Sequence, residues 1–464
     1  MLALICVSVA QLMVALDATV INIALPTAQH ALHLSTSERQ WVVTAYTLAF
    51  GGLLLLGGRI ADTLGRRRAF LAGLAGFAAA SAAGGAAPSF GALLAARAAQ
   101  GAFAALLAPT ALSLLAVTFT QARERAKAFA MFGAIAGMGG ALGLLLGGFL
   151  TEYLQWRWCL FINVPIAIAA LLAGRRALPA VPAQRGARPD IAGAILVTAG
   201  LVSLVYGLSE ASMKGWSSPM IFGSLTAAAL LLAAFATLES RIGSPLLPPR
   251  IVADRNRAGS CAAIGLAVVA MYGLFLLLTY DFQAARGYSP LLAGVAFLPL
   301  SAAVLASSTT ISRALLPRVR PRALMVPGLL IGAAGMAWLT LLTSKSGYVT
   351  HVLPAELLLG LGMGAVFVPA FSTATAGVSQ REAGVASAVA GSAQQVGASV
   401  GVALLNTVAA TTTSAYLVAH RTAGSSAALV HGYATAAGWA AAVLAGAAVL
   451  VAVLVNAGRP DPHQ

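Results

Sequence analysis

The chain has 464 residues, of which 59% are hydrophobic and only 9% are charged, and its formal net charge is +15 at pH 7. This composition excludes a soluble globular protein, in which about a quarter of the residues are charged. Apolar runs of about 20 residues, each long enough to cross a bilayer as a helix, recur from end to end, so the sequence predicts an all-α polytopic membrane protein. The basic residues lie in short loops between these runs and not on one surface, which excludes a nucleic-acid partner.

The apolar runs, taken in chain order, predict fourteen membrane-spanning helices. They are expected at roughly 3–26, 40–58, 69–88, 90–117, 126–150, 156–174, 190–208, 219–238, 258–282, 289–312, 322–342, 350–376, 384–410 and 433–455. Most Lys and Arg residues lie on the side that carries the loop after the second run, and Arg39 is among the few on the opposite side. Because cytoplasmic loops carry the excess of basic residues, that side is predicted to be cytoplasmic, together with both termini.

Two basic loops of similar size indicate an internal repeat. The first, Arg59–Arg68, follows the second run, and the other, Arg313–Arg322, follows the tenth. If the loops occupy equivalent places, the chain consists of a six-helix bundle at 1–174, an inserted helix pair at 175–257 and a second six-helix bundle at 258–464. This 6+2+6 plan, with a substrate site between the bundles, is typical of secondary transporters.

Two opposite charges are expected at the same depth of the membrane. Asp17 lies within the first apolar run and Arg97 within the fourth. At ~1.5 Å per residue, they lie about 13 Å and about 10 Å from the outer ends of their helices. A nearby guanidinium favours the charged carboxylate, whereas burial alone favours the protonated one, so the pair can be poised between the two states. We therefore predict a proton-coupling pair; the alternative is a static ion pair that fixes helix packing.

The loop after the second run carries a regular pattern of glycine, acidic and basic residues. Gly58, Asp62, Gly65, Arg66 and Arg67 predict a conformational latch. In such a latch, the Asp62 carboxylate binds a helix N-terminus or an arginine in one state and releases it in the other. The alternative is a solvated charged loop.

The fifth apolar run contains glycines that are four residues apart. Gly139, Gly143 and Gly147, with Gly148 beside them, predict a close contact between helices. Small residues at this spacing let two helices approach each other in lipid. A hinge at these glycines would be an additional hypothesis.

Other polar residues inside the apolar runs are candidates for a substrate cavity. They are Asn22, Gln100, Asp281, Gln283, Glu356, Gln394 and Gln395. For Asp281 and Gln283 the alternative is solvation at the outer interface, and for Glu356 it is a side chain that extends to that interface.

The sequence gives no sign of a metal site, a cofactor or an enzyme active centre. Cys6, Cys159 and Cys261 lie alone in apolar runs, and the histidines form no cluster with metal-ligand spacing. The segment Gly397–Gly401 matches the G-x-S-x-G pattern of hydrolases, but it lies in an apolar run with no strand before it. We therefore expect neither catalysis nor any cofactor, and a proton gradient as the energy source.

The motifs described above resemble those of the major facilitator superfamily, and within it those of the fourteen-helix multidrug/proton antiporter branch. Gly58–Arg67 is similar to the family's loop motif, Leu16–Pro26 to the first-helix motif of that branch, and Arg97–Gly101 to its fourth-helix motif. Gly287–Pro290 resembles the entry to the tenth helix. The resemblance covers the whole chain, and it implies the major facilitator fold with the fourth-helix arginine in proton coupling.

Three positions depart from the family pattern. Thr63 occupies a place that is usually basic, Leu144 replaces the proline of the fifth-helix antiporter motif, and Leu316 stands in the second basic loop where Asp62 stands in the first. The missing proline leaves antiport, symport and uniport open.

We predict a monomeric secondary transporter of the cytoplasmic membrane that exports amphipathic small molecules or drugs in exchange for protons. Asp17 and Arg97 would couple the proton, and the apolar cleft between the bundles would bind the substrate. One alternative is a facilitator or a proton symporter on the same fold. Another is a membrane receptor or scaffold without transport activity. The expected partners are a small-molecule substrate, protons and lipid, with no nucleic acid.

Overall fold

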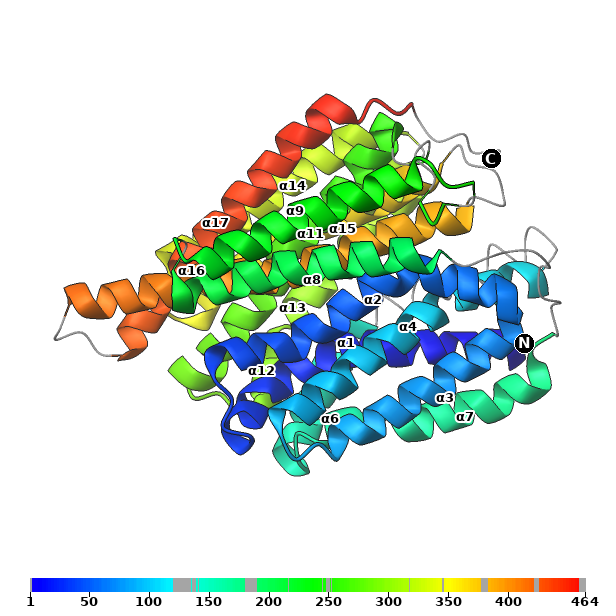
Figure 1. Ribbon diagram of the computed structural model, residues 1–464. Coiled ribbons are helices and arrows are strands. Elements are labelled where there is room, and N and C mark those ends of the chain that lie inside the picture. Colours follow the sequence, from blue (N-terminus) through cyan, green and yellow to red (C-terminus); the bar gives the residue numbers. More distant parts are fainter. Residues whose placement is uncertain are drawn as a thin grey trace.

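The computed structural model consists of helices and their connections. It describes residues 2–119, 135, 139–140, 142–179, 190–215, 217–243, 245–247, 251, 253–316, 318–343, 346–376, 383–420 and 425–458. Within these ranges every regular element is helical, and the long helices run roughly along one common direction (Figure 1). The predicted all-α architecture is therefore confirmed.

The first bundle begins with four long helices. They are α1 (Leu2–Ala31), α2 (Thr36–Leu64), α3 (Arg66–Gly85) and α4 (Phe90–Thr118), followed by a helix at Leu142–Tyr153, α6 (Trp158–Phe161) and α7 (Asn163–Ala177). A capping box starts α2, in which the Ser35 hydroxyl accepts from the Glu38 amide and the Glu38 carboxylate accepts from the Ser35 amide. Gly65 joins α2 to α3 with a φ of 85°, a left-handed conformation that glycine adopts without strain.

Two helices lie between the bundles in sequence. These are α8 (Ile191–Lys214) and α9 (Pro219–Glu239), which pack against each other. Helix α8 also contacts α2 and α16, so the pair lies along the junction of the two halves (Figure 1). Leu48 of α2, Leu201 of α8 and Ala403 of α16 share a buried apolar cluster at this junction.

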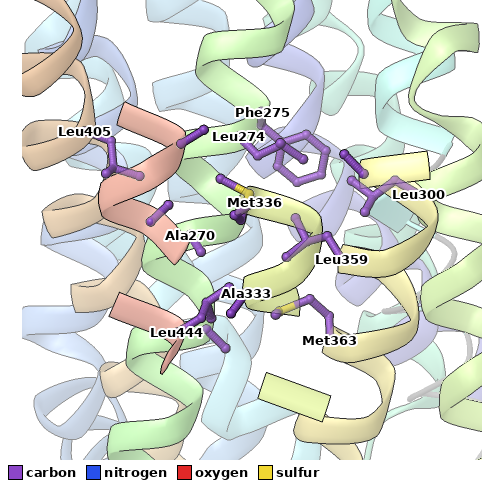
Figure 2. Close-up of a cluster of buried hydrophobic side chains, with 14 of the residues drawn as sticks. Ala270, Leu274, Phe275, Leu300, Ala333, Met336, Leu359, Met363, Leu405 and Leu444 are labelled. Carbon is purple, nitrogen blue, oxygen red and sulfur yellow. The ribbon is translucent and has the colours of Figure 1, made fainter. Parts of the chain in front are cut away.

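The second bundle contains more interruptions than the first. Its α-helices are α11 (Arg255–Tyr280), α12 (Pro290–Ala296), α13 (Leu298–Thr310), α14 (Pro321–Trp338), α15 (Leu353–Thr375), α16 (Ala383–Ala419) and α17 (Ser425–Leu454). Short π-helical or 3-10 turns adjoin them at η1 (Asp281–Ala285), η2 (Ile311–Leu315), η3 (Leu339–Leu341) and η4 (Tyr348–Val352). Side chains such as Phe275, Leu359 and Leu444 meet in the apolar core of this bundle (Figure 2).

Twelve helices of the described residues are long and apolar enough to cross a membrane, so the chain is a multi-pass membrane protein. The fourteen predicted spans are not all confirmed. Helix α3 has the length of a span, but it starts with three arginines and is otherwise rich in glycine and alanine, which lowers its hydrophobicity. Most of the predicted span at 126–150 lies outside the described residues, and the helix at Leu142–Tyr153 covers only its end.

The two bundles meet along α2 and α16 and, less extensively, along α1 and α11. Thr47 Oγ1 of α2 lies 2.7 Å from Ser399 Oγ of α16. One to two turns away, the Ser392 hydroxyl donates to the Gly51 carbonyl at 2.9 Å. Polar contacts therefore supplement apolar packing between the bundles.

Candidate functional site

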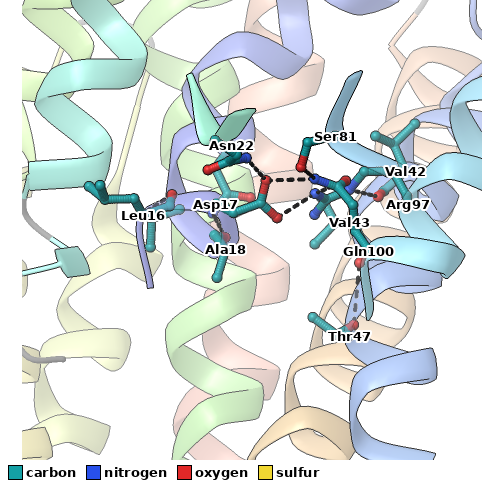
Figure 3. A network of polar contacts seen from close by, with 12 residues as sticks. Leu16, Asp17, Ala18, Asn22, Val42, Val43, Thr47, Ser81, Arg97 and Gln100 are labelled. Carbon is teal, nitrogen blue, oxygen red and sulfur yellow. Dashed lines mark hydrogen bonds and ion pairs between the residues drawn. The ribbon is translucent and has the colours of Figure 1, made fainter. Parts of the chain in front are cut away.

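A buried polar network surrounds Asp17 in the first bundle (Figure 3). The carboxylate is fully buried and accepts three hydrogen bonds. Arg97 Nη1 donates to its Oδ2 at 2.7 Å, while Gln100 Nε2 and Asn163 Nδ2 donate to its Oδ1 at 3.0 and 2.7 Å. The structure thus places Asp17 and Arg97 in direct contact as an ion pair.

Arg97 is held by several groups at once. Its Nε donates to the Val42 carbonyl at 3.1 Å, and its Nη1 also donates to Gln100 Oε1 at 2.9 Å. The guanidinium carbon lies 4.4 Å from the centre of the Tyr46 ring, which is a cation–π contact. Gln100 extends the network by donating to Ser81 Oγ at 2.7 Å. Arg97 Nη2 is buried without a hydrogen-bond partner among the described residues.

Five helices of the first bundle build this network. Asp17 comes from α1, Val42 and Tyr46 from α2, Ser81 from α3, Arg97 and Gln100 from α4, and Asn163 from α7. Arg97 and Gln100 face Asp17 together because residues three apart lie on the same face of a helix. The network is therefore specified by single polar residues on helices that are otherwise apolar.

The surroundings of Asp17 match an ionised carboxylate. Three donors stabilise the ionised carboxylate in this arrangement. Without Arg97 the carboxylate would be an isolated charge in apolar surroundings, which is strongly unfavourable.

The glycines of the fifth apolar run contact α1 beside Asp17. A Cβ atom on Gly143 would lie 2.0 Å from Thr19 Oγ1, and one on Gly147 would lie 2.7 Å from the Val20 carbonyl oxygen. The helix can approach α1 this closely only because these positions lack side chains.

Gly139 and Gly148 extend the close packing in opposite directions. A Cβ atom on Gly139 would lie 2.5 Å from the Ala15 Cβ of α1. One on Gly148 would lie 2.6 Å from the Pro290 carbonyl oxygen of α12, which belongs to the second bundle. The helix at Leu142–Tyr153 therefore lies between α1 and α12 and contacts both bundles.

The predicted latch is only partly described. Gly58 and Asp62 lie in the last turns of α2, Gly65 forms the turn, and Arg66 and Arg67 begin α3. The Asp62 side chain lies outside the described residues. Arg67 donates to the Arg175 carbonyl near the end of α7, which is a contact inside the first bundle. The latch stays a prediction.

The seven cavity candidates do not form one site. Gln100 belongs to the Asp17 network, and Asn22 makes a long hydrogen bond of 3.5 Å to the Ala18 carbonyl of its own helix. Gln394 and Gln395 are half-buried on α16, where Gln395 lies against Gly51 of α2.

The remaining three candidates are held by separate partners. Asp281 pairs with Arg286 at 2.5 Å, and Gln283 donates to the Ile23 carbonyl of α1 at 3.0 Å. Glu356 is fully buried and does not extend to an interface. A pocket of about 460 Å³ lies elsewhere, between α17 and η3, and none of the predicted site residues lines it.

Arg39 connects the two bundles at their end opposite the start of α1. A loop position was expected for it, but Arg39 is buried in the first turn of α2. Its Nη2 donates to Asn406 Oδ1 of α16 at 2.8 Å, and its guanidinium carbon lies 3.8 Å from the centre of the Tyr280 ring of α11. The expectation was wrong because Asn406 and Tyr280 replace water around the charge. Both residues are distant from Arg39 in the sequence, so the sequence around Arg39 does not indicate them.

Replacing Asn406 by Leu is expected to weaken this contact between the bundles. The change removes the acceptor of Arg39 Nη2, and a buried charged donor without its partner costs about 1.5–3 kcal/mol. A cysteine introduced at the buried Ser399 should then react faster with a thiol reagent, because the bundles separate more often. Thr407→Val is the matched control, since it removes a bond to the Leu208 carbonyl of α8 and none between the bundles. Equal labelling rates in the two variants would contradict this role of Arg39.

Sequence reasoning missed three members of the Asp17 network. They are Tyr46, Ser81 and Asn163. Asn163 could have been found, because it is a strongly polar residue within an apolar run, and Asp17 was identified for the same reason. Tyr46 and Ser81 give no comparable signal, since hydroxyl groups are common in membrane helices.

Two helical bundles with a buried ionisable network in one of them are typical of a secondary transporter. The chain belongs to the Major Facilitator Superfamily, whose family model matches residues 7–402. It is 52% identical over 458 residues to the puromycin resistance protein pur8 of Streptomyces alboniger, covering 98% of this chain and 91% of the relative. It is 39% identical over 464 residues to the cephamycin export protein CmcT of Amycolatopsis lactamdurans, covering 99% and 93%.

Solved structures share the fold at low sequence identity. The POT family transporter PepTSo matches with a TM-score of 0.71 at 16% identity, covering 97% of this chain and 98% of that chain. The human organic anion transporter MFSD10 (TETRAN) matches with a TM-score of 0.60 at 19% identity, covering 96% and 98%. The major facilitator fold is thus confirmed, whereas the fourteen-helix arrangement is not.

Proposed function

We propose that the protein exports amphipathic small molecules, antibiotics among them, across the cytoplasmic membrane in exchange for protons. The observation that carries the proposal is the fully buried ion pair of Asp17 and Arg97 inside a transporter fold. The relatives support the substrate class and the direction, because they are named for antibiotic resistance and export. Puromycin is the first compound to test, since the relative named for it is 52% identical to this chain over 458 residues.

In the proposed cycle, Asp17 exchanges its proton when Arg97 changes partners. The Val42 carbonyl and Gln100 Oε1 already accept from Arg97, so the guanidinium keeps acceptors when it leaves the carboxylate. A motion that separates α1 from α4 would favour the protonated acid, and the reverse motion would release the proton. Uptake of the proton on one side of the membrane and its release on the other would drive export of the substrate.

We further propose that the protein is a monomer that spans the membrane fourteen times, with both termini cytoplasmic. The bundles would comprise 1–174 and 258–464, and the inserted pair 175–257. Helix α3 supports this count, because its 20 residues span about 30 Å and it packs against α4 and α7. Helices α8 and α9 support the insertion, because α9 packs on α8, and α8 packs on one helix of each bundle.

Transport in everted membrane vesicles tests this function. Vesicles that contain the protein should take up puromycin when their interior is acidified, and adding puromycin should release protons from the interior into the medium. Uptake without proton movement would indicate a facilitator, and uptake by right-side-out vesicles alone would indicate an importer. An absence of flux for every member of a panel of antibiotics would exclude export.

A further inference from the structure

A second carboxyl group is buried in the second bundle without a basic partner among the described residues. Glu356 lies in the first turn of α15 and is fully buried. Among the described residues its only hydrogen-bond partner is Tyr348 of η4, whose hydroxyl oxygen lies 3.2 Å from Glu356 Oε2. Glu356 Oε1 is buried without any partner in the described part of the chain. The cycle proposed above gives this carboxyl group no role.

The Tyr348 hydroxyl lies between two oxygen atoms but has only one proton. It is 2.7 Å from the Ala296 carbonyl oxygen and 3.2 Å from Glu356 Oε2. A carbonyl oxygen can only accept, so the shorter contact takes the tyrosine proton. The contact with Glu356 is then a hydrogen bond only if the carboxyl group itself is protonated and donates to the Tyr348 oxygen.

Among the described side chains, no ionisable group around α15 gives Glu356 a counter-charge; the side chain of Arg313 in η2, which also packs against α15, lies outside them. Asp281 and Arg286 of the η1 segment pair with each other, and His351 of η4 contacts Thr350. The helices packed against α15 contribute Arg255, Arg257, Cys261, Tyr272, Tyr280, Arg322 and Tyr416, and no hydrogen bond or ion pair joins any of them to Glu356. Tyr288 stacks on Phe282, and Lys345 lies outside the described residues.

Glu356 and Arg97 each lie about twelve residues before a proline of the same helix. Arg97 precedes Pro109 by twelve residues within α4, and Glu356 precedes Pro369 by thirteen residues within α15. If α4 and α15 are equivalent helices of the two bundles, each bundle places one ionisable group at this position.

We propose that Glu356 is a second proton-binding group of the transport cycle, protonated in this conformation, and that it controls α12 through Tyr348. When the proton leaves Glu356 for water, the carboxylate becomes the stronger acceptor and the Tyr348 hydroxyl turns its proton from the Ala296 carbonyl to Glu356. The end of α12 then loses its tether to η4. The inference rests on the proposed proton-coupled function and adds a site to it.

The position of α12 gives this switch a consequence for transport. Its first residues contact the helix at Leu142–Tyr153 of the first bundle, where the Leu291 amide donates to the Glu152 carboxylate at 2.9 Å. Releasing α12 from Tyr348 would loosen this contact between the bundles. Deprotonation of Glu356 would thus favour their separation at that end.

Infrared difference spectra of the full-length protein, recorded between acidic and alkaline buffer, test the protonation of Glu356. The wild-type spectrum should contain the C=O band of a protonated carboxyl group that Glu356→Gln removes. Glu152→Gln, at a carboxylate in an exposed contact, is the matched control and should leave the band in place. Identical spectra for Glu356→Gln and the wild type would overturn the proposal. So would a new carboxyl band in Lys345→Gln, because it would show that Lys345 had kept Glu356 ionised.

Spin labels at the exposed residues Tyr153 and Leu292 test the link to α12. Their separation, measured by pulsed electron resonance, should increase with pH in the wild type, and it should not depend on pH in Glu356→Gln. Tyr348→Phe should give the longer distance at every pH, because the phenyl ring cannot hold the Ala296 carbonyl. A pH-dependent distance in Tyr348→Phe would overturn the switch. Asp17→Asn separates this proposal from the proposed function. If this variant still exchanged protons for puromycin, the proposed role of Asp17 would fail, whereas the carboxyl band of Glu356 would still test the present proposal.

Discussion

The Asp17→Asn protein should insert normally in the membrane but release no protons when puromycin is added to everted vesicles. Asparagine has the shape of aspartate and can still accept from Gln100 or Asn163, and Arg97, although it loses its counter-charge, still donates to the Val42 carbonyl and Gln100 Oε1, so the helices keep their packing. It cannot exchange a proton, and uptake driven by an acid interior should fall to the level of vesicles without the protein. The measurement is fluorescence of a pH-sensitive dye together with labelled puromycin.

Arg97 provides the control for this result. Arg97→Met leaves the Asp17 carboxylate buried without its partner, which costs about 3–5 kcal/mol in folding stability. The double variant with Asp17→Asn should recover most of that stability, because removing both charges leaves no isolated ion, but it should not recover transport. Thermal unfolding in detergent measures the first effect and vesicle flux the second. Proton-coupled transport by either Asp17→Asn variant would refute the coupling role.

The ion pair could be predicted from the sequence because a charged residue inside an apolar run is visible in the sequence itself, and burying such a charge is costly. Asp17 and Arg97 each stand alone in an apolar run, so each needs a partner, and their depths leave few choices. The orientation of Asn163 toward the same carboxylate follows from the packing of α7 on α1, which no pattern in the sequence specifies.

Arg39 shows the limit of the same reasoning near the end of a helix. A basic residue next to an apolar run is equally compatible with a loop and with a buried first turn. Its location is decided by Tyr280 and Asn406, which come from two other helices of the second bundle. The separate locations of the seven cavity candidates could not be predicted for a related reason, because they depend on how the helices pack together and not on any single residue.

Replacing Gly147 by Ala is expected to displace α1 and to impair transport. The new Cβ would lie 2.7 Å from the Val20 carbonyl oxygen and 3.1 Å from Val20 Cα, and backbone atoms cannot rotate away as a side chain would. Overpacking of this kind costs about 1–3 kcal/mol. Since Asp17 lies one turn before Val20, the shift would also disturb its hydrogen bonds with Arg97 and Asn163. The melting temperature in detergent and the puromycin flux should both fall.

Gly140→Ala is the matched control for this prediction, because Gly140 lies in the same glycine-rich run but no described atom is within 4 Å of its would-be Cβ. Alanine favours the helix over glycine by about 0.5–1 kcal/mol, so this variant should be as stable as the wild type or slightly more stable. If Gly147→Ala were as stable and as active as Gly140→Ala, neither stability nor transport would require the close approach of the helix at Leu142–Tyr153 to α1. The glycines would then have no part in positioning Asp17, and the packing of α1 against the other helices of the network, α2, α4 and α7 among them, would suffice.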